Sequence, residues 1–499
     1  MDQSNTSWMS RLAEHYERIR CCLPDEDLMI LFDIDGTILD SRYMIHFALS
    51  SYDRAHGTQW FRDLTVEDIM VNESQVELLL EGLNIGGGQR DGIIAWYNER
   101  CWSPEGILRS HRPFMGVMEV IRWFQIQPRT YVGLNTGRPE SIRRETLISL
   151  NNIGREYKVS FSNEHLFMNR RGWGEGVIEE KMEGIRHFRA AGFHVIAFVD
   201  NEPENLQAVA GMEGVDELLL LHAHTLFRSQ REQLPARSVA GKEYDITELV
   251  QERALPRHVQ FVWHGVNDEA NLRQFLASNV EWAECDVRFD SGGEAVVLRN
   301  DSFAETPLDS GERLMGFKEI LESLRGKDKS LKIDIKENGL LLNRVLEILH
   351  AQGFPDRRLW FNGMVEVLRE EGFRKLKEVF PGAVIQCPID FLIPLILGAP
   401  AKALAILDVL QGWGINRFSI NWKAQEKQEI IAKLERWGYE LNIYNVPDLE
   451  AFLKAVLLLP RSVTADFNFP KWHYFGRGPG WKRRHFEYSL VRAPEGPVL

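Results

Sequence analysis

Short apolar runs alternate with helix-like segments along most of the chain, and this alternation constrains the fold more than any other sequence feature. A first series of such runs lies at 28–35, 130–135, 158–162, 194–200 and 217–222. Strands separated by helices predict an open parallel sheet with helices on both faces. We therefore predict an α/β domain with a Rossmann-like sheet over residues 1–230. The long gap after the first run predicts a helical cap at about 41–115.

A second series of strand-like runs fills the C-terminal half, again with helical patterns between them. These runs lie at 260–264, 281–289, 331–336, 359–362, 383–387, 417–422, 440–446 and 462–467. Eight strand–helix units in roughly 240 residues are typical of a (β/α)8 TIM barrel. The pattern predicts such a barrel over 258–499. The polar, irregular stretch 231–257 predicts a linker between the two domains.

The overall composition narrows the class of protein. The chain has 499 residues, with 44% hydrophobic and 26% charged residues, as in ordinary soluble proteins. Its net charge of -13 argues against a nucleic-acid partner, because phosphate backbones select basic surfaces. Five cysteines without a CxxC motif fit a reducing compartment. No signal-like run opens the chain, and the apolar stretch 391–410 is interrupted by proline, glycine and charged residues, so we expect no stable membrane insertion and a cytoplasmic location. The oligomeric state stays open.

Two carboxylates stand at the end of the first apolar run. Asp33 and Asp35 are two residues apart, so strand alternation places both side chains on the same side, and Gly36 permits a sharp turn after them. Carboxylate oxygens at the carboxyl end of a strand suit a hard cation such as Mg²⁺. The alternative is a capped turn with solvated aspartates.

Further polar residues follow the later strands of the first series. Thr136 and Gly137 come after the second run and offer a hydroxyl and backbone donors. Lys181 lies on a predicted helix before the fourth run, which ends in Asp200. Because the carboxyl ends of parallel strands meet at one edge, this set favours a single site over isolated turns.

The set DxDGT, threonine, lysine and the acidic VDN segment resembles the haloacid dehalogenase superfamily of phosphatases over roughly residues 26–225. The resemblance implies that Asp33 is a nucleophile that forms an aspartyl-phosphate. It implies that Asp35 is the general acid and then the base for water. A dehalogenase has no need of this acid, so Asp35 favours a phosphatase.

The same resemblance assigns the remaining residues. Thr136, Gly137 and Lys181 would hold the phosphoryl oxygens, which stabilises the developing charge. Asp33, the main-chain carbonyl of Asp35, and Asp200 would bind Mg²⁺.

Ionisable residues also recur at the carboxyl ends of the predicted barrel strands, where TIM-barrel active sites lie. His264 ends the first strand, Glu284 and Asp286 lie on the second, and Asp334 and Lys336 lie on the third. Three inward carboxylates would repel one another unless a cation or protons compensate. Oxygen-only ligands favour Mg²⁺ or Ca²⁺ over zinc. A single such aspartate could instead be a structural capping group.

These barrel segments resemble the phospholipase C-like phosphodiesterase superfamily, which includes glycerophosphodiester phosphodiesterases and the menorin-type barrels, over about residues 258–470. By that resemblance Glu284, Asp286 and Asp334 would bind the metal, Lys336 would contact a phosphate oxygen, and His264 would be a general acid or base. Glycerophosphodiesterases carry a second histidine after the second strand, where this chain has Arg299. An arginine can clamp a phosphate but cannot supply a proton near neutral pH.

The sequence thus favours a bifunctional, metal-dependent phosphoric-ester hydrolase. The barrel would cleave a phosphodiester of a small-molecule or lipid-derived substrate, and the N-terminal domain would dephosphorylate the resulting monoester. One alternative is a phosphatase whose barrel only binds a ligand. Another is a scaffold without catalysis, which the intact pair Asp33 and Asp35 disfavours.

Overall fold

The computed structural model describes residues 7–466 except 72, 173, 225–233, 251–254, 257 and 309–312. The chain forms two compact units, Met1–Gln251 and Glu252–Leu499. In the described part of the chain no helix is both long and apolar enough to span a lipid bilayer.

The first unit is built on a six-stranded sheet in the order β3-β2-β1-β4-β5-β6. All neighbouring strands are parallel. Every residue of the central strand β1 is buried, as expected for a parallel strand that is covered on both faces. The strands are β1 (Leu28–Phe32), β2 (Thr130–Pro139), β3 (Leu166–Asn169), β4 (His194–Asp200), β5 (Leu219–Ala223) and β6 (Val239–Gly241).

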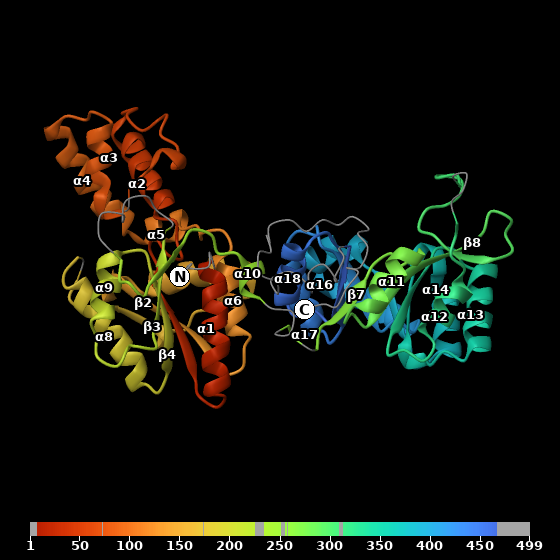
Figure 1. The fold of residues 1–499 in the computed structure, drawn as a ribbon. Helices are drawn as coiled ribbons and strands as arrows, with labels where there is room; N and C mark the ends of the chain where they lie inside the picture. The colour runs from red at the N-terminus through yellow and green to blue at the C-terminus, as the bar shows by residue number, and fades with distance from the viewer. Residues whose placement is uncertain are drawn as a thin grey trace. The chain divides into compact units, whose positions relative to one another are not determined.

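Helices cover both faces of this sheet (Figure 1). Helices α1 (Trp8–Cys22) and α6 (Val117–Gln125) lie on one face, and α8 (Val177–Ala190) and α9 (Pro203–Ala210) lie on the other. Helix α7 (Arg143–Gly154) follows β2. The α/β class with a Rossmann-type parallel sheet is therefore confirmed.

A helical insertion follows β1 and forms a cap. It contains α2 (Ser41–His56), α3 (Val76–Gly82), α4 (Gly87–Cys101) and α5 (Pro104–Ser110). Its helices α2, α3 and α4 stand beyond one end of the sheet in Figure 1. The cap has a hydrophobic core of its own, which includes Met44, Leu49, Ile93 and Tyr97.

Two parts of the first unit differ from the sequence predictions. The run 158–162 is not a strand, and β3 begins later, at Leu166. The side chain of Asn151 accepts from the N–H of Phe161 and donates to its carbonyl, so these backbone groups have partners without a neighbouring strand. The segment 231–257, which we expected to be a linker, contributes β6 and α10 (Ile246–Leu249) to the first unit.

The second unit is a closed barrel of eight parallel strands, with one antiparallel strand, β9 (Val296–Leu298), beside β8. Closure follows from the pairing of β7 with both β15 and β8, and of β8 with β10. All eight predicted barrel strands are present, so the TIM barrel is confirmed. They are β7 (Gln260–Trp263), β8 (Trp282–Phe289), β10 (Ser330–Ile335), β11 (Leu359–Asn362), β12 (Val384–Pro388), β13 (Arg417–Asn421), β14 (Glu440–Val446) and β15 (Ser462–Ala465).

Helices alternate with the barrel strands. They are α11 (Glu269–Ala277), α12 (Phe317–Leu324), α13 (Leu340–Gln352), α14 (Val365–Val379), α15 (Ile393–Gly398), α16 (Pro400–Gly412), α17 (Lys427–Arg436) and α18 (Leu449–Leu457). The register of β8 and β10 pairs Glu284 with Lys332 and Asp286 with Asp334. Alternate residues of a strand share one face, so this register brings these four charged side chains together.

Candidate active sites

The first candidate site lies at the carboxyl end of β1, where Asp33 and Asp35 are both buried. Gly36 follows with a φ of +74°, and a Cβ there would lie 2.4 Å from Asn201 Nδ2. A side chain at this position would therefore collide with the segment after β4. The turn thus needs glycine, as the sequence predicted.

Lys181 connects two of the predicted site carboxylates. Its Nζ lies 2.6 Å from Asp33 Oδ1 and 2.8 Å from Asp200 Oδ2, and it donates to the carbonyl of Asn135 at 2.9 Å. Burial by itself lowers the pKa of Lys181, but Asp200 and Asp33 outweigh burial and raise it. The ammonium is therefore a fixed positive charge beside Asp33.

Arg138 holds the other predicted site carboxylate, Asp35, through both of its oxygens. Its Nε and Nη2 donate to the two carboxylate oxygens of Asp35, both at 2.6 Å. The guanidinium also donates to Thr146 Oγ1 and meets His111 Nε2 at 3.1 Å. Burial, then the charge of Arg138, lowers the pKa of His111, so that ring is neutral. This bidentate pair fixes the orientation of the Asp35 carboxyl.

Thr136 and Gly137 lie between these two ion pairs on β2. Thr136 is buried, and its Oγ1 accepts from the N–H of Arg138 at 3.2 Å. A Cβ at Gly137 would lie 3.1 Å from Val177 Cγ1, so the strand approaches the start of α8 closely.

The environment of Asp33 disfavours its charged form. Burial raises the pKa of Asp33 to about 7, Lys181 opposes the rise, and the nearby charge of Asp200 adds to it. Asp200 itself is buried and accepts from the N–H of Glu202 at 2.8 Å and from Asn205 at 3.1 Å.

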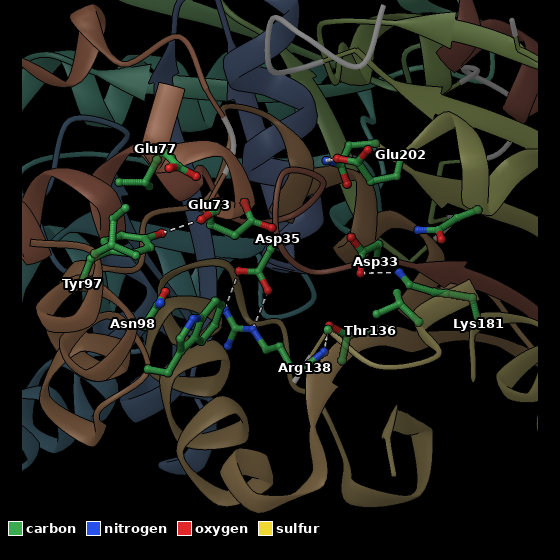
Figure 2. Close-up of a pocket in the computed structure, with 18 residues that line it drawn as sticks. Asp33, Asp35, Glu73, Glu77, Tyr97, Asn98, Thr136, Arg138, Lys181 and Glu202 are labelled. Carbon is green, nitrogen blue, oxygen red and sulfur yellow. Dashed lines mark hydrogen bonds and ion pairs between the residues drawn. The ribbon is translucent and has the colours of Figure 1, made fainter. Parts of the chain in front are cut away.

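These groups open onto a cavity of about 460 Å³ that the cap helps to enclose (Figure 2). Figure 2 shows Asp33, Thr136 and Lys181 on one side of it, and Glu73 and Tyr97 of the cap on the other. Burial, and then the charge of Asp35, raises the pKa of Glu73 to about 7. The lining residues are Asp33, Asp35, Glu73, Val76, Glu77, Ile94, Tyr97, Asn98, Trp102, Thr136, Gly137, Arg138, Gly174, Val177, Lys181, Asn201, Glu202 and Asn205.

The chemistry of the donors suits Mg²⁺ at this site. Asp33 and Asp200 offer carboxylate oxygens within a buried, acidic environment, and oxygen-only donors are those that Mg²⁺ prefers. A divalent cation would also offset the charge of Asp200, which adds to the effect of burial in raising the pKa of Asp33. Within the described residues no three His, Cys, Asp or Glu side chains are gathered as if around one ion. At this site Lys181 lies between the two aspartates.

The second candidate site lies inside the barrel, where lysines join the predicted carboxylates. Lys336 Nζ lies 2.7 Å from Asp286 Oδ1 and 2.5 Å from Asp334 Oδ2. Lys332 Nζ lies 3.2 Å from Glu284 Oε1. Burial by itself would raise the pKa of Asp286, but Lys336 outweighs it and lowers that pKa, so the carboxylate is charged.

His264 lies beside these carboxylates. Its Nδ1 is 2.5 Å from Asp466 Oδ1, and its Nε2 is 3.9 Å from Glu284 Oε2. Burial alone would lower the pKa of His264, but Glu284 and then Asp466 raise it to about 9. The ring is therefore protonated at neutral pH and could donate a proton.

The donor atoms of the barrel site also suit a divalent cation. Glu284 Oε2 is a buried atom without a hydrogen-bond partner in the described structure, and its neighbours Asp286 and Asp334 supply only oxygen donors. A divalent ion would satisfy that oxygen, which lies 3.9 Å from His264 Nε2 and accepts no hydrogen bond from it.

Arg299 lies at the edge of this group. Its guanidinium lies over the ring of Phe303, 4.6 Å from the centroid, and its main-chain N–H donates to the carbonyl of Asp286 at 2.9 Å. The structure therefore ties its backbone to the site, while its side chain packs on an aromatic ring.

The structure thus brings the predicted residues together as two groups, and it shows contacts that sequence reasoning did not predict. The contacts of Arg138 with Asp35 and of Asp466 with His264 are the clearest; the sequence does place Asp466 on the last barrel strand, but it does not indicate that Asp466 meets His264. Arg138 directly follows the Thr–Gly pair, but nothing in the sequence indicates that it reaches Asp35, 103 positions earlier. Lys332 had a readable signal, since it alternates with Asp334 and Lys336 along one strand face. No pattern in the sequence indicated that Glu73 and Tyr97 of the cap line the site.

No family model and no curated protein matches the chain. Similar solved structures include a putative glycerophosphoryl diester phosphodiesterase from Agrobacterium tumefaciens, with 13% identity, a TM-score of 0.35, and coverage of 42% of this chain and 94% of that one. A phosphodiesterase from Oleispira antarctica, solved with sn-glycerol-3-phosphate, has 18% identity, a TM-score of 0.34, and coverage of 44% and 95%. A HAD-superfamily hydrolase from Geobacter sulfurreducens has 14% identity, a TM-score of 0.30, and coverage of 44% and 92%.

Each of these matches covers fewer than half of the residues of this chain. The matched proteins are of the two kinds that the sequence resembles, a barrel phosphodiesterase and a haloacid dehalogenase-type hydrolase. At such identities and TM-scores they carry no inference about chemistry, which has to come from the two sites themselves.

Proposed function

We propose that the first unit is a phosphomonoesterase that works through an aspartyl-phosphate. The observation that carries this proposal is the pairing of Asp33 with Lys181 at 2.6 Å, beside an Asp35 that Arg138 holds through both oxygens. A nucleophile, a proton-transfer group and a cation for the phosphoryl oxygens thus line one cavity of about 460 Å³. This volume suits a small phosphomonoester.

In the proposed reaction an oxygen of Asp33 attacks phosphorus, and the bond from phosphorus to the leaving oxygen breaks. Asp35 in its protonated form gives its proton to that oxygen, and as the carboxylate paired with Arg138 it then takes a proton from the water that hydrolyses the aspartyl-phosphate. Lys181 and Thr136 contact the phosphoryl oxygens and stabilise their charge. Mg²⁺, held by Asp33, Asp200 and the Asp35 carbonyl, would neutralise further charge on the phosphoryl group.

We further propose that the barrel hydrolyses a phosphodiester, so that the chain acts on phosphoric esters at two sites. His264 would protonate the leaving oxygen, and Asp466, 2.5 Å from its Nδ1, would fix the orientation of its ring. Glu284, Asp286 and Asp334 would hold Mg²⁺ or Ca²⁺, which would offset the charge of the phosphate. Lys336 would contact a phosphate oxygen. The monoester released would then be a substrate for the first unit.

Two chromogenic esters test both proposals on the full chain. With Mg²⁺, p-nitrophenyl phosphate should be hydrolysed, and Asp33→Asn should abolish this activity while hydrolysis of bis-p-nitrophenyl phosphate survives. Glu284→Gln should have the opposite effect. Monoester hydrolysis that persists in Asp33→Asn would refute the first proposal. Diester hydrolysis that persists in Glu284→Gln would refute the barrel assignment, and its absence in the wild type would favour a ligand-binding barrel.

A further inference from the structure

The active-site cavity of the first unit has two chemically different sides (Figure 2). On the side of the sheet, Asp33, Thr136 and Lys181 face the position of the phosphoryl group. On the side of the cap, the lining comes from α3, α4 and the segments next to them, and it faces the organic part of a substrate. These cap residues are Glu73, Val76, Glu77, Ile94, Tyr97, Asn98 and Trp102.

The cap side is acidic. Glu73 and Glu77 line it, and no described cap residue in the lining is a lysine or an arginine. The two cations of the cavity, Arg138 and Lys181, come from the sheet domain and are already paired with Asp35, Asp33 and Asp200. A second anionic group on the substrate would therefore meet negative charge without a free counterion.

Glu73 has one carboxylate oxygen, Oε2, that is buried and has no hydrogen-bond partner among the described residues. The Ser41 hydroxyl is close enough to the same carboxyl to oppose the rise in its pKa. The hydroxyl of Tyr97 donates to the main-chain carbonyl of Glu73 at 3.0 Å, which holds this residue against α4. A buried acceptor without a donor is costly, so a ligand that supplies N–H groups would bind here with a gain.

The rest of the cap side suits a cation with apolar surroundings. Tyr97 contributes an aromatic ring, and Val76 and Ile94 contribute apolar walls, whereas the Arg138 guanidinium already lies over the ring of Trp102, 5.2 Å from its centroid. Aromatic rings attract ammonium groups through their π faces, and an ammonium offers three donors to nearby carboxylates. A carboxylate with aromatic and apolar neighbours is therefore selective for an amine over a hydroxyl or a methyl group.

We propose that the cap selects phosphomonoesters whose organic part carries a protonated amine, with Glu73 and Glu77 as the residues that recognise it. This inference rests on the proposed phosphomonoesterase activity of the first unit, and it names the class of substrate. Glu73 receives N–H donors from the ammonium, and Glu77 adds negative charge at the more exposed side of the cavity. The phosphoryl group then lies at Asp33 and Lys181.

Matched substrates test the proposal with the full chain and Mg²⁺. O-phosphoethanolamine is compared with propyl phosphate, and glucosamine 6-phosphate with glucose 6-phosphate, by the rate of phosphate release. In at least one pair the amine should have a kcat/KM about tenfold higher or more, since one charged hydrogen bond of about 1.5–3 kcal/mol corresponds to such a ratio. Phosphoglycolate, which carries a second negative charge, should be the poorest substrate.

Substitutions in the cap then assign the preference. Glu73→Gln should reduce the amine-to-neutral ratio about tenfold, and Glu77→Gln should reduce it by a smaller factor. Because Glu77 is exposed, its variant should fold even if Glu73→Gln does not. The matched control is Glu99→Gln, an exposed residue of α4 that does not line the cavity, and it should leave the ratio unchanged.

The outcomes separate this inference from the function on which it rests. If Asp33→Asn abolishes monoester hydrolysis but amines show no advantage in either pair, the cap assignment is wrong while the phosphatase stands. The cap assignment is equally wrong if an amine preference is unchanged in both Glu73→Gln and Glu77→Gln. If no monoester is hydrolysed at all, the proposed activity fails and this inference fails with it.

Discussion

Replacement of Lys181 by methionine tests whether the two buried carboxylates of the first site depend on Lys181 as their counterion. The ammonium is 2% exposed and lies within 2.8 Å of a carboxylate oxygen of both Asp33 and Asp200. Methionine fills a similar volume but leaves both carboxylates without their counterion. Removal of one partner from a buried ion pair typically costs about 3–5 kcal/mol. We expect Lys181→Met to lower the free energy of unfolding of the first unit by about this amount.

Differential scanning calorimetry in EDTA measures the effect, because the two units can give separate transitions. For a unit of this size, about 2–4 °C are lost per kcal/mol, so the affected transition should move down by on the order of 10 °C. The control is Arg186→Met on the same helix, since Arg186 pairs with Glu183 at the surface and is 57% exposed. That substitution should change stability by less than about 1 kcal/mol.

Lys181→Met leaves Asp33 and Asp200 without their counterion, and neutralisation of one of these two carboxylates provides a second measurement. Lys181→Met combined with Asp200→Asn should recover part of the lost stability, because only one buried carboxylate then lacks a counterion. A Lys181→Met variant that melts within about 2 °C of the wild type, less than the loss expected for 1 kcal/mol, would refute the reasoning. So would a double variant that is less stable than Lys181→Met alone.

Other predictions concern pH. The pKa of Asp33 is raised to about 7 in the folded protein, from about 3.9 in an unfolded chain. Between these two pH values folded Asp33 keeps a proton that the unfolded chain releases. The unfolding free energy of the metal-free protein should therefore fall between about pH 4 and pH 7. Asp33→Asn removes this contribution, so denaturant titrations in EDTA should find it increasingly more stable than the wild type as the pH rises to about 8; parallel curves would contradict the assignment. His264 should titrate near pH 9 by NMR, and Asp466→Asn should lower that pKa. The raised pKa of His264 stabilises the folded barrel fully below about pH 6.5, and this contribution should be lost as the pH rises through about 9. An unchanged His264 titration in Asp466→Asn would rule out the pairing of His264 with Asp466.

Much of the fold could be predicted from local sequence patterns alone. Strand and helix periodicity has a short range, so the parallel sheet, the cap and the eight barrel strands could be predicted from local patterns. The shared side of Asp33 and Asp35 and the shared face of Glu284 and Asp286 on β8 followed from the same periodicity, because side-chain direction alternates along a strand. The failed strand at 158–162 shows the limit of that reasoning, since Asn151 supplies its hydrogen bonds from another element.

Which charged side chains contact one another could not be predicted from the sequence and is known from the three-dimensional structure. Arg138 reaches Asp35, Lys181 joins Asp33 to Asp200, and Asp466 meets His264 from the opposite end of the barrel sequence. The energy of such a contact depends on the distance between atoms and on burial, and neither is set by residues that are neighbours in the chain. The same holds for the acidic side of the cavity, because the fold of the cap places Glu73 opposite Asp33.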